Sequence, residues 1–203
     1  MNKPVATPSD VLEFWFGAYP LDLQVMQQEQ ARWFQKNEAF DAELRDRFLP
    51  TIEAARAGHL DQWAQDPASW LALLIVLDQF PRNAFRGQPD AFASDAQALR
   101  VALAGIERGH DKALPPMARV FCYLPLEHAE DLAMQRRSVA LFSALVEAPD
   151  AEPADFLAVT LDFAHKHLEV IERFGRFPHR NAVLGRVNTA AEQDYLAQPG
   201  AGF

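Results

Sequence analysis

The sequence has little of what several classes of protein require. Its single cysteine, Cys122, excludes an internal disulfide, and the apolar run F-C-Y-L around it favours a buried small hydrophobe over a nucleophile. The longest apolar run, residues 70–77, is far shorter than the ~20 residues of a membrane helix. The N-terminal residues contain no apolar signal core. We therefore expect a cytoplasmic protein with no membrane partner.

Positive charge is scarce as well. The 203 residues include 19 Lys and Arg against 28 Asp and Glu, which gives a net charge of −9. A basic face is the usual footprint of nucleic-acid binding, so we expect no nucleic-acid partner. The hydrophobic content of 49% is ordinary for a globular chain that buries a full core. The length predicts a single domain over residues 1–203.

Strand-like alternation is hard to find, and helical periodicity dominates the chain. Proline and glycine mark most of the breaks and divide the sequence into about eight to ten helices. The sequence therefore predicts an all-α fold of antiparallel helix pairs, stacked in an array or in a compact bundle. The segment 67–78 is apolar on every side, so we expect it to be a central helix that ends just before a loop at Phe80.

The most unusual stretch, residues 172–186, reads E-R-F-G-R-F-P-H-R-N-A-V-L-G-R. It holds four arginines and one histidine, with no acid after its first residue, in a chain of net negative charge. Its two glycines and its proline should prevent a helix and form a shaped loop. Part of it has a counterpart upstream, where F-P-R-N-A at 80–84 parallels F-P-H-R-N-A at 177–182. We expect the two loops to face one cleft.

Guanidinium groups bind carboxylates and phosphates through planar two-point contacts. The two loops therefore predict a site for a small anionic molecule or a peptide carboxylate. We assign ligand-binding roles to the polar side chains of these loops and their neighbours: Asp78, Arg82, Asn83, Arg86, Tyr123, Arg176, Arg180 and Asn181. The structural alternative is that Asp78 and Arg82 form a buried pair while Asn83 satisfies loop backbone groups.

Three side chains qualify for proton transfer: His179, Glu127 and His128. The arginines beside His179 should lower its pKa and keep the imidazole neutral, which suits a base. Glu127 and His128 belong to the acidic bend Y-L-P-L-E-H-A-E-D. The alternative is that the acids of this bend cap helix ends. No metal-ligand spacing or nucleotide-binding glycine pattern occurs, so we expect neither a metal nor another cofactor.

Long motifs extend over nearly the whole chain. They read V-L-E-F-W-F-G, W-F-Q-K-N-E-A-F-D-A-E-L-R-D-R-F, L-D-Q-F-P-R-N-A-F-R-G, Y-L-P-L-E-H-A-E-D, H-L-E-V-I-E-R-F-G-R-F-P-H-R-N and L-G-R-V-N-T-A-A-E. In these motifs the chain resembles the bacterial family called domain of unknown function 924. The resemblance implies an all-helical fold similar to tetratricopeptide-repeat proteins, and no activity. One departure is Ala129, where the family pattern L-E-H-S-E-D has serine, so serine-based chemistry is not expected there.

Two functions remain open, and with them the question of whether the protein is an enzyme. The first is a small-molecule site in which the arginines bind an anion and the acid and imidazoles transfer protons. The second is a non-catalytic interaction scaffold whose concave face binds a peptide or protein. The polar groups sit on predicted loops, whereas repeat scaffolds place ligand contacts along helix faces, which favours the first. A third interpretation gives every polar loop residue a structural role.

Overall fold

The protein is entirely helical wherever its structure is described. The structure is a computed structural model that describes residues 4–202, and no strand occurs within that range. The predicted all-α fold is therefore confirmed, as a compact arrangement of helices. None of the helices within 4–202 combines the length and the apolar character that a membrane crossing needs. The single domain and the repeat-like stacking stay predictions.

Helices and short helical turns follow one another along the described chain. The α-helices are α1 (Pro8–Phe16), α2 (Leu23–Phe34), α3 (Glu38–Arg56), α4 (Pro67–Leu74), α5 (Phe80–Ala84), α6 (Asp95–Glu107), α7 (Pro116–Glu127), α8 (Leu132–Val146), α9 (Ala154–Phe174) and α10 (Ala190–Leu196). Shorter 3₁₀ helices are η1 (Asp61–Gln65), η3 (Pro89–Ala91), η4 (Asp111–Ala113) and η5 (Pro178–Arg180), and η2 (Ile75–Gln79) is a π-helical stretch.

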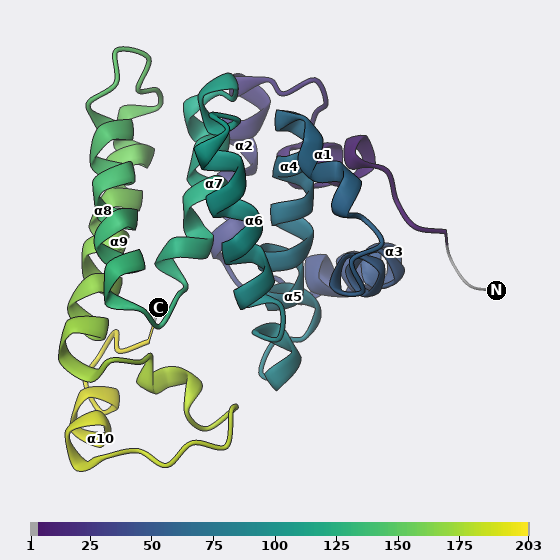
Figure 1. Cartoon of the computed structure of the whole chain (residues 1–203). Coiled ribbons are helices and arrows are strands. Elements are labelled where there is room, and N and C mark those ends of the chain that lie inside the picture. The colour runs from purple at the N-terminus through teal and green to yellow at the C-terminus, as the bar shows by residue number, and fades with distance from the viewer. Residues whose placement is uncertain (1–3, 203) are drawn as a thin grey trace.

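The helices form two groups, as Figure 1 shows. Helices α8 and α9 lie side by side as an antiparallel hairpin at one edge of the molecule, and α1 to α7 pack together beside them. The chain after α9 continues below this hairpin, where α10 lies, and its end returns toward the connection between α7 and α8 (Figure 1). This C-terminal segment, residues 175–202, therefore lies near the ends of helices that are far from it in the sequence.

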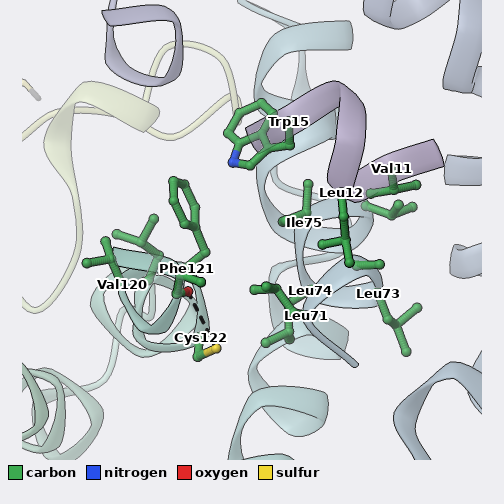
Figure 2. Packing of buried hydrophobic residues seen from close by; sticks show 14 of the residues in the cluster. Val11, Leu12, Trp15, Leu71, Leu73, Leu74, Ile75, Val120, Phe121 and Cys122 are labelled. Atoms are coloured by element: carbon green, nitrogen blue, oxygen red, sulfur yellow. Dashed lines mark hydrogen bonds between the residues drawn. The ribbon is translucent and has the colours of Figure 1, made fainter. Parts of the chain in front are cut away.

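The apolar helix α4 lies at the centre of the core, as its sequence predicts. Its side chains Leu71, Leu74 and the adjacent Ile75 are fully buried between α1 and α7 (Figure 2). Trp15 of α1 and Phe121 of α7 pack edge to face, with ring centroids 5.7 Å apart. Each such aromatic side chain removes roughly 150–250 Å² of surface from water, so these contacts hold the two faces of α4 in place.

Helix α4 continues beyond the point where the sequence predicts a loop. It passes through the π-helical stretch η2 into α5, so the expectation of a loop at 80–84 is wrong. Pro81 has no amide hydrogen and cannot make a regular helical bond. The chain responds by widening one turn, in which the Phe80 amide donates to the carbonyl of Ile75. In a regular helix the amide of residue 81 donates to the carbonyl of Leu77. Here the Ser94 hydroxyl donates to this carbonyl, at 2.7 Å.

The Ser94 hydroxyl supports this turn, so its removal should weaken the fold. Ser94 is buried, and Ser94→Ala deprives the Leu77 carbonyl of a donor that water cannot easily replace. We expect the free energy of unfolding to fall by about 1–2 kcal/mol, measured by urea denaturation. Ser9→Ala, an exposed change on α1, serves as the control and should alter it by less than about 0.5 kcal/mol. Equal effects of the two substitutions would contradict this role.

Candidate functional site

Ionisable side chains gather in the interior where the C-terminal segment meets η2, α5, α6, α7 and α9. Charged groups are rarely buried unless they are paired, which makes such a concentration the main candidate for a functional site. We call this group the Asp78 network, and its members are Asp78, Arg82, Asp95, Glu127, His128, His167 and Arg180.

Acids and arginines alternate through the network. Arg82 lies between two acids, with its Nη1 3.3 Å from Asp78 Oδ1 and with two hydrogen bonds to the carboxylate of Asp95 (2.9 and 3.1 Å). Asp95 in turn accepts from Nη1 of Arg180 at 3.2 Å. The order Asp78, Arg82, Asp95, Arg180 places each charge beside opposite ones, which offsets the cost of removing them from water. This line of alternating charges ends at Arg180.

Arg180 is a cation with unused hydrogen-bonding capacity. Its guanidinium carbon lies 4.7 Å from the ring centroid of Phe92 and 4.5 Å from that of Phe177. Its side chain is only 7% exposed, and its Nε is buried without a hydrogen-bond acceptor in the part of the chain that the structure describes. Burial, and then the charge of Arg82, lower the pKa of Arg180 to about 10, so the group stays positive at neutral pH.

His128 is oriented by Asp78 at the end of α7. Its Nδ1 lies 2.8 Å from Asp78 Oδ1, and Gln79 donates to the other oxygen at 2.6 Å. Burial opposes ionisation of Asp78, but Arg82 and His128 outweigh it and hold the pKa of Asp78 well below its usual value. The ionised carboxylate keeps the hydrogen on Nδ1 of His128, so Nε2 is the basic nitrogen. Burial and then Arg82 lower the pKa of His128, against the attraction of Asp78.

Glu127 and His167 meet as two neutral groups. Glu127 Oε1 lies 3.2 Å from His167 Nδ1. Burial, and then the charge of Asp78, raise the pKa of Glu127 to about 8, while burial and then His128 lower the pKa of His167 to about 3. The same Nδ1 lies 2.8 Å from the carbonyl of Phe163, which only accepts, so the nitrogen carries the hydrogen. Glu127 therefore keeps its own proton, and its buried Oε2 meets no partner within residues 4–202.

His179 lies beside the network on η5. Its ring centroid is 5.6 Å from that of Phe177, and burial and then the charge of Arg180 lower the pKa of His179 to about 4. The backbone of Gly202 passes directly over it, because a Cβ added at residue 202 lies 2.8 Å from the Cβ of His179. The C-terminal segment thus covers His179.

Three other predicted residues make contacts in different places. Asn83 and Arg86 both donate to Asp41 of α3, Asn83 at 2.7 Å and Arg86 at 2.7 and 3.1 Å. Tyr123 donates its hydroxyl to Asp111 at 2.8 Å. These pairs connect helices to one another, and their acids, Asp41 and Asp111, are not members of the Asp78 network. Their ligand-binding roles stay predictions.

The remaining two predicted residues stabilise the C-terminal segment. Arg176 donates to both oxygens of Glu192 at 2.6 and 2.8 Å and to the carbonyl of Val187 at 2.9 Å. Asn181 donates to the side chain of Asn188 at 2.7 Å. Glu192 belongs to the capping box of α10, so this pairing attaches the arginine-rich stretch to that helix.

The structure brings six of the predicted residues together, in or beside the network: Asp78, Arg82, Glu127, His128, His179 and Arg180. Sequence reasoning missed Asp95 and His167 as members. The sequence did contain an indication for His167. This residue lies on the buried face of α9 with Ala164 and Ile171, where an ionisable side chain is unusual. Asp95 gave no signal, because an acid in the first turn of a helix is ordinary.

Metal ligation is not favoured by the arrangement of the acids and imidazoles. Within residues 4–202, no group of three or more His, Cys, Asp or Glu side chains is placed so that it could hold a metal ion. The network offers instead two guanidinium groups, a neutral carboxylic acid and a carboxylate-oriented imidazole.

Fold and network together define an all-helical protein with a buried cluster of ionisable side chains. The chain belongs to the family described as bacterial protein of unknown function (DUF924), whose model matches residues 11–200. This confirms the predicted family. The solved structure of the protein of unknown function ATU0120 from Agrobacterium tumefaciens is similar, with 40% identity, a TM-score of 0.79, and coverage of 94% of this chain and 96% of that chain. No curated protein matches the chain.

The raised pKa of Glu127 should make the protein less stable in mild alkali. Its pKa of about 8 in the folded protein exceeds the ordinary 4.5, so the folded state holds a proton that the unfolded chain releases. The stability that this proton contributes is complete below about pH 4.5 and is lost as the pH rises toward 8. Between pH 6.5 and 8.5 we expect the free energy of unfolding of the wild type to fall by about 2 kcal/mol more than that of Glu127→Gln.

Urea denaturation of both proteins at the two pH values measures this difference. Glu43→Gln removes an exposed carboxylate of α3 and is the control, with the same pH dependence as the wild type. If Glu127→Gln also shows the wild-type pH dependence, Glu127 is ionised in the folded protein and the assignment of a neutral acid is wrong.

Proposed function

We propose that the Asp78 network binds a small molecule through a carboxylate group and transfers a proton on it. The observation that carries this proposal is the state of Arg180, a buried guanidinium whose Nε has no acceptor within the described chain. A buried donor without a partner costs about 1–3 kcal/mol, and more when it is charged. A ligand that supplies the acceptor recovers this energy.

A carboxylate suits the free edge of Arg180. Guanidinium and carboxylate are both planar and form two parallel hydrogen bonds, which are shorter and stronger than neutral ones. The alternating line that begins at Asp78 ends on this cation, so a ligand carboxylate continues the alternation beyond it. The rings of Phe92 and Phe177 support the guanidinium without competing for its N–H groups.

Two members of the network are suited to opposite halves of a proton transfer. His128 is neutral, and Asp78 holds the hydrogen on Nδ1, so Nε2 can accept a proton from the ligand while Asp78 stabilises the imidazolium. Glu127 is protonated at neutral pH and can donate a hydrogen bond to an oxygen on which negative charge develops. The shifted pKa values of these two groups support an acid–base role.

A small molecule fits this site better than a peptide or protein partner. The groups that would recognise the ligand lie inside the molecule, with Asp78 fully buried and Arg180 nearly so. Partners of an interaction scaffold contact side chains on its surface. The proposal includes a cytoplasmic location, no cofactor, and no nucleic-acid or membrane partner, in line with the net charge of −9.

Carboxylates should stabilise the wild type through Arg180. A ligand present at tenfold excess over its Kd raises the free energy of unfolding by about 1.4 kcal/mol, which is a rise of about 3–6 °C in Tm for a chain of this size. We expect this response in thermal unfolding with formate, acetate and benzoate, compared with chloride at equal ionic strength. Arg180→Gln should remove it, because the free N–H edge is lost.

Arg119→Gln is the matched control for this experiment. Arg119 is also a largely shielded arginine, but it pairs with Asp150 and the Leu114 carbonyl outside the network. This variant should keep the full response to carboxylates whatever its own stability. The proposal fails if no carboxylate raises the Tm of the wild type above that in chloride, or if Arg119→Gln and Arg180→Gln lose the response equally.

Proton transfer should be visible on a carboxylate that also carries an acidic C–H bond, and pyruvate is the simplest probe. We expect the protein to speed exchange of the pyruvate methyl hydrogens in D2O, followed by proton NMR. His128→Gln should slow the exchange by about 10²–10⁴-fold, because the base is removed. His59→Gln, an exposed change, should leave the rate as it is. Exchange at the same rate with and without His128 would exclude this residue as the base.

A further inference from the structure

We infer that Asp95 makes the site selective for the charge of its ligand: the site binds a single carboxylate and rejects dianions such as sulfate or phosphate. This inference rests on the proposed function, since it concerns the ligand of the same site. Its basis is the position of Asp95, which is the acid shared by both arginines of the network.

Asp95 already occupies the donors that a dianion needs. Both of its oxygens accept from Arg82, at 2.9 and 3.1 Å, and one of them also accepts from Arg180 at 3.2 Å. A tetrahedral dianion is best held by two guanidinium forks at once. The carboxylate of Asp95 stands between the two forks and accepts from both. The Nε edge of Arg180 is left for a ligand, because this buried Nε has no acceptor within residues 4–202. That edge matches one planar carboxylate.

The charge count leads to the same restriction. The two arginines of the network are balanced by the carboxylates of Asp78 and Asp95. The nearby Arg186 contributes no surplus charge, because Glu130 binds it through two hydrogen bonds of 2.6 and 2.8 Å. A monoanion adds one negative charge, which a single proton on an imidazole offsets. A dianion adds two in a region that excludes water, where an uncompensated charge is costly.

Asp95 is also placed where a ligand can approach. Its side chain is 19% exposed, whereas that of Asp78 at the other end of the line is fully buried. Asp78 is therefore enclosed, while Asp95 borders the solvent-reachable side of the network. Removing the charge of Asp95 leaves no acid between the two guanidinium groups, and the carboxylate of Asp78 then balances only one of their two charges. Such an arrangement favours a doubly charged ligand.

The test compares the wild type, Asp95→Asn and Asp90→Asn. Asp90 is an exposed acid of η3 that pairs with Arg56, so Asp90→Asn removes the same charge from the same region outside the network. Thermal unfolding is followed with acetate, sulfate and chloride at equal ionic strength, and apparent Kd values are obtained from the dependence of Tm on concentration. General salt effects are removed by subtracting the chloride series.

We expect the wild type and Asp90→Asn to bind acetate at least tenfold more tightly than sulfate, and Asp95→Asn to reverse this preference. If Asp95→Asn does not fold alone, sulfate should restore its folding and acetate should not. Asp95→Glu, which keeps the charge, should keep the wild-type preference. An unchanged preference in Asp95→Asn, or an unfolded Asp95→Asn that sulfate does not rescue, would overturn the inference.

The result also separates this inference from the proposed function. Loss of the acetate response in the wild type contradicts the ligand site itself. An acetate response that persists in the wild type, together with an unaltered selectivity in Asp95→Asn, leaves the site in place and removes only the role of Asp95.

Discussion

The structure depends on one carboxylate, Asp78, that is ionised and fully buried. An ionised carboxylate in a protein interior requires opposite charge and hydrogen bonds on its oxygens, and here Arg82, Gln79 and His128 supply them. These partners come from η2, α5 and the end of α7. Satisfying one buried charge therefore ties together helices that are about fifty residues apart in the chain, and it orients the imidazole of His128 at the same time.

The backbone that presents Asp78 results from a local conflict between proline and helix. Pro81 cannot continue a regular helix, and the chain resolves this with a π turn while Ser94 donates to a carbonyl next to it. The same turn brings Asp78 and Arg82 to one side, so the two interact directly. A packing helix and part of the candidate site thus belong to one continuous segment.

Much of the fold was predictable from the sequence, because helical periodicity, proline and glycine are local signals. The apolar segment around Leu71 and Leu74 indicated its central position, since no side of it could face water. The error at 80–84 has a physical cause: F-P-R-N-A looks like a helix break, but a proline is tolerated in the first turn of a new helical segment. Pattern alone does not distinguish these two outcomes.

For the candidate site, the sequence by itself determined which residue types were available: unusual arginines, a Glu-His pair and a second histidine within recognisable motifs. Only the tertiary structure decided which of them meet. Arg86 and Arg176 resemble Arg82 and Arg180 in their local sequence. Yet Arg86 pairs with Asp41 and Arg176 pairs with Glu192. Asp95, in contrast, binds both Arg82 and Arg180. Partner choice of this kind depends on distances between segments far apart in the chain. For the same reason, burial and neighbouring charge, and not residue type, raise the pKa of Glu127 and lower that of His128, so that both side chains are neutral near pH 7.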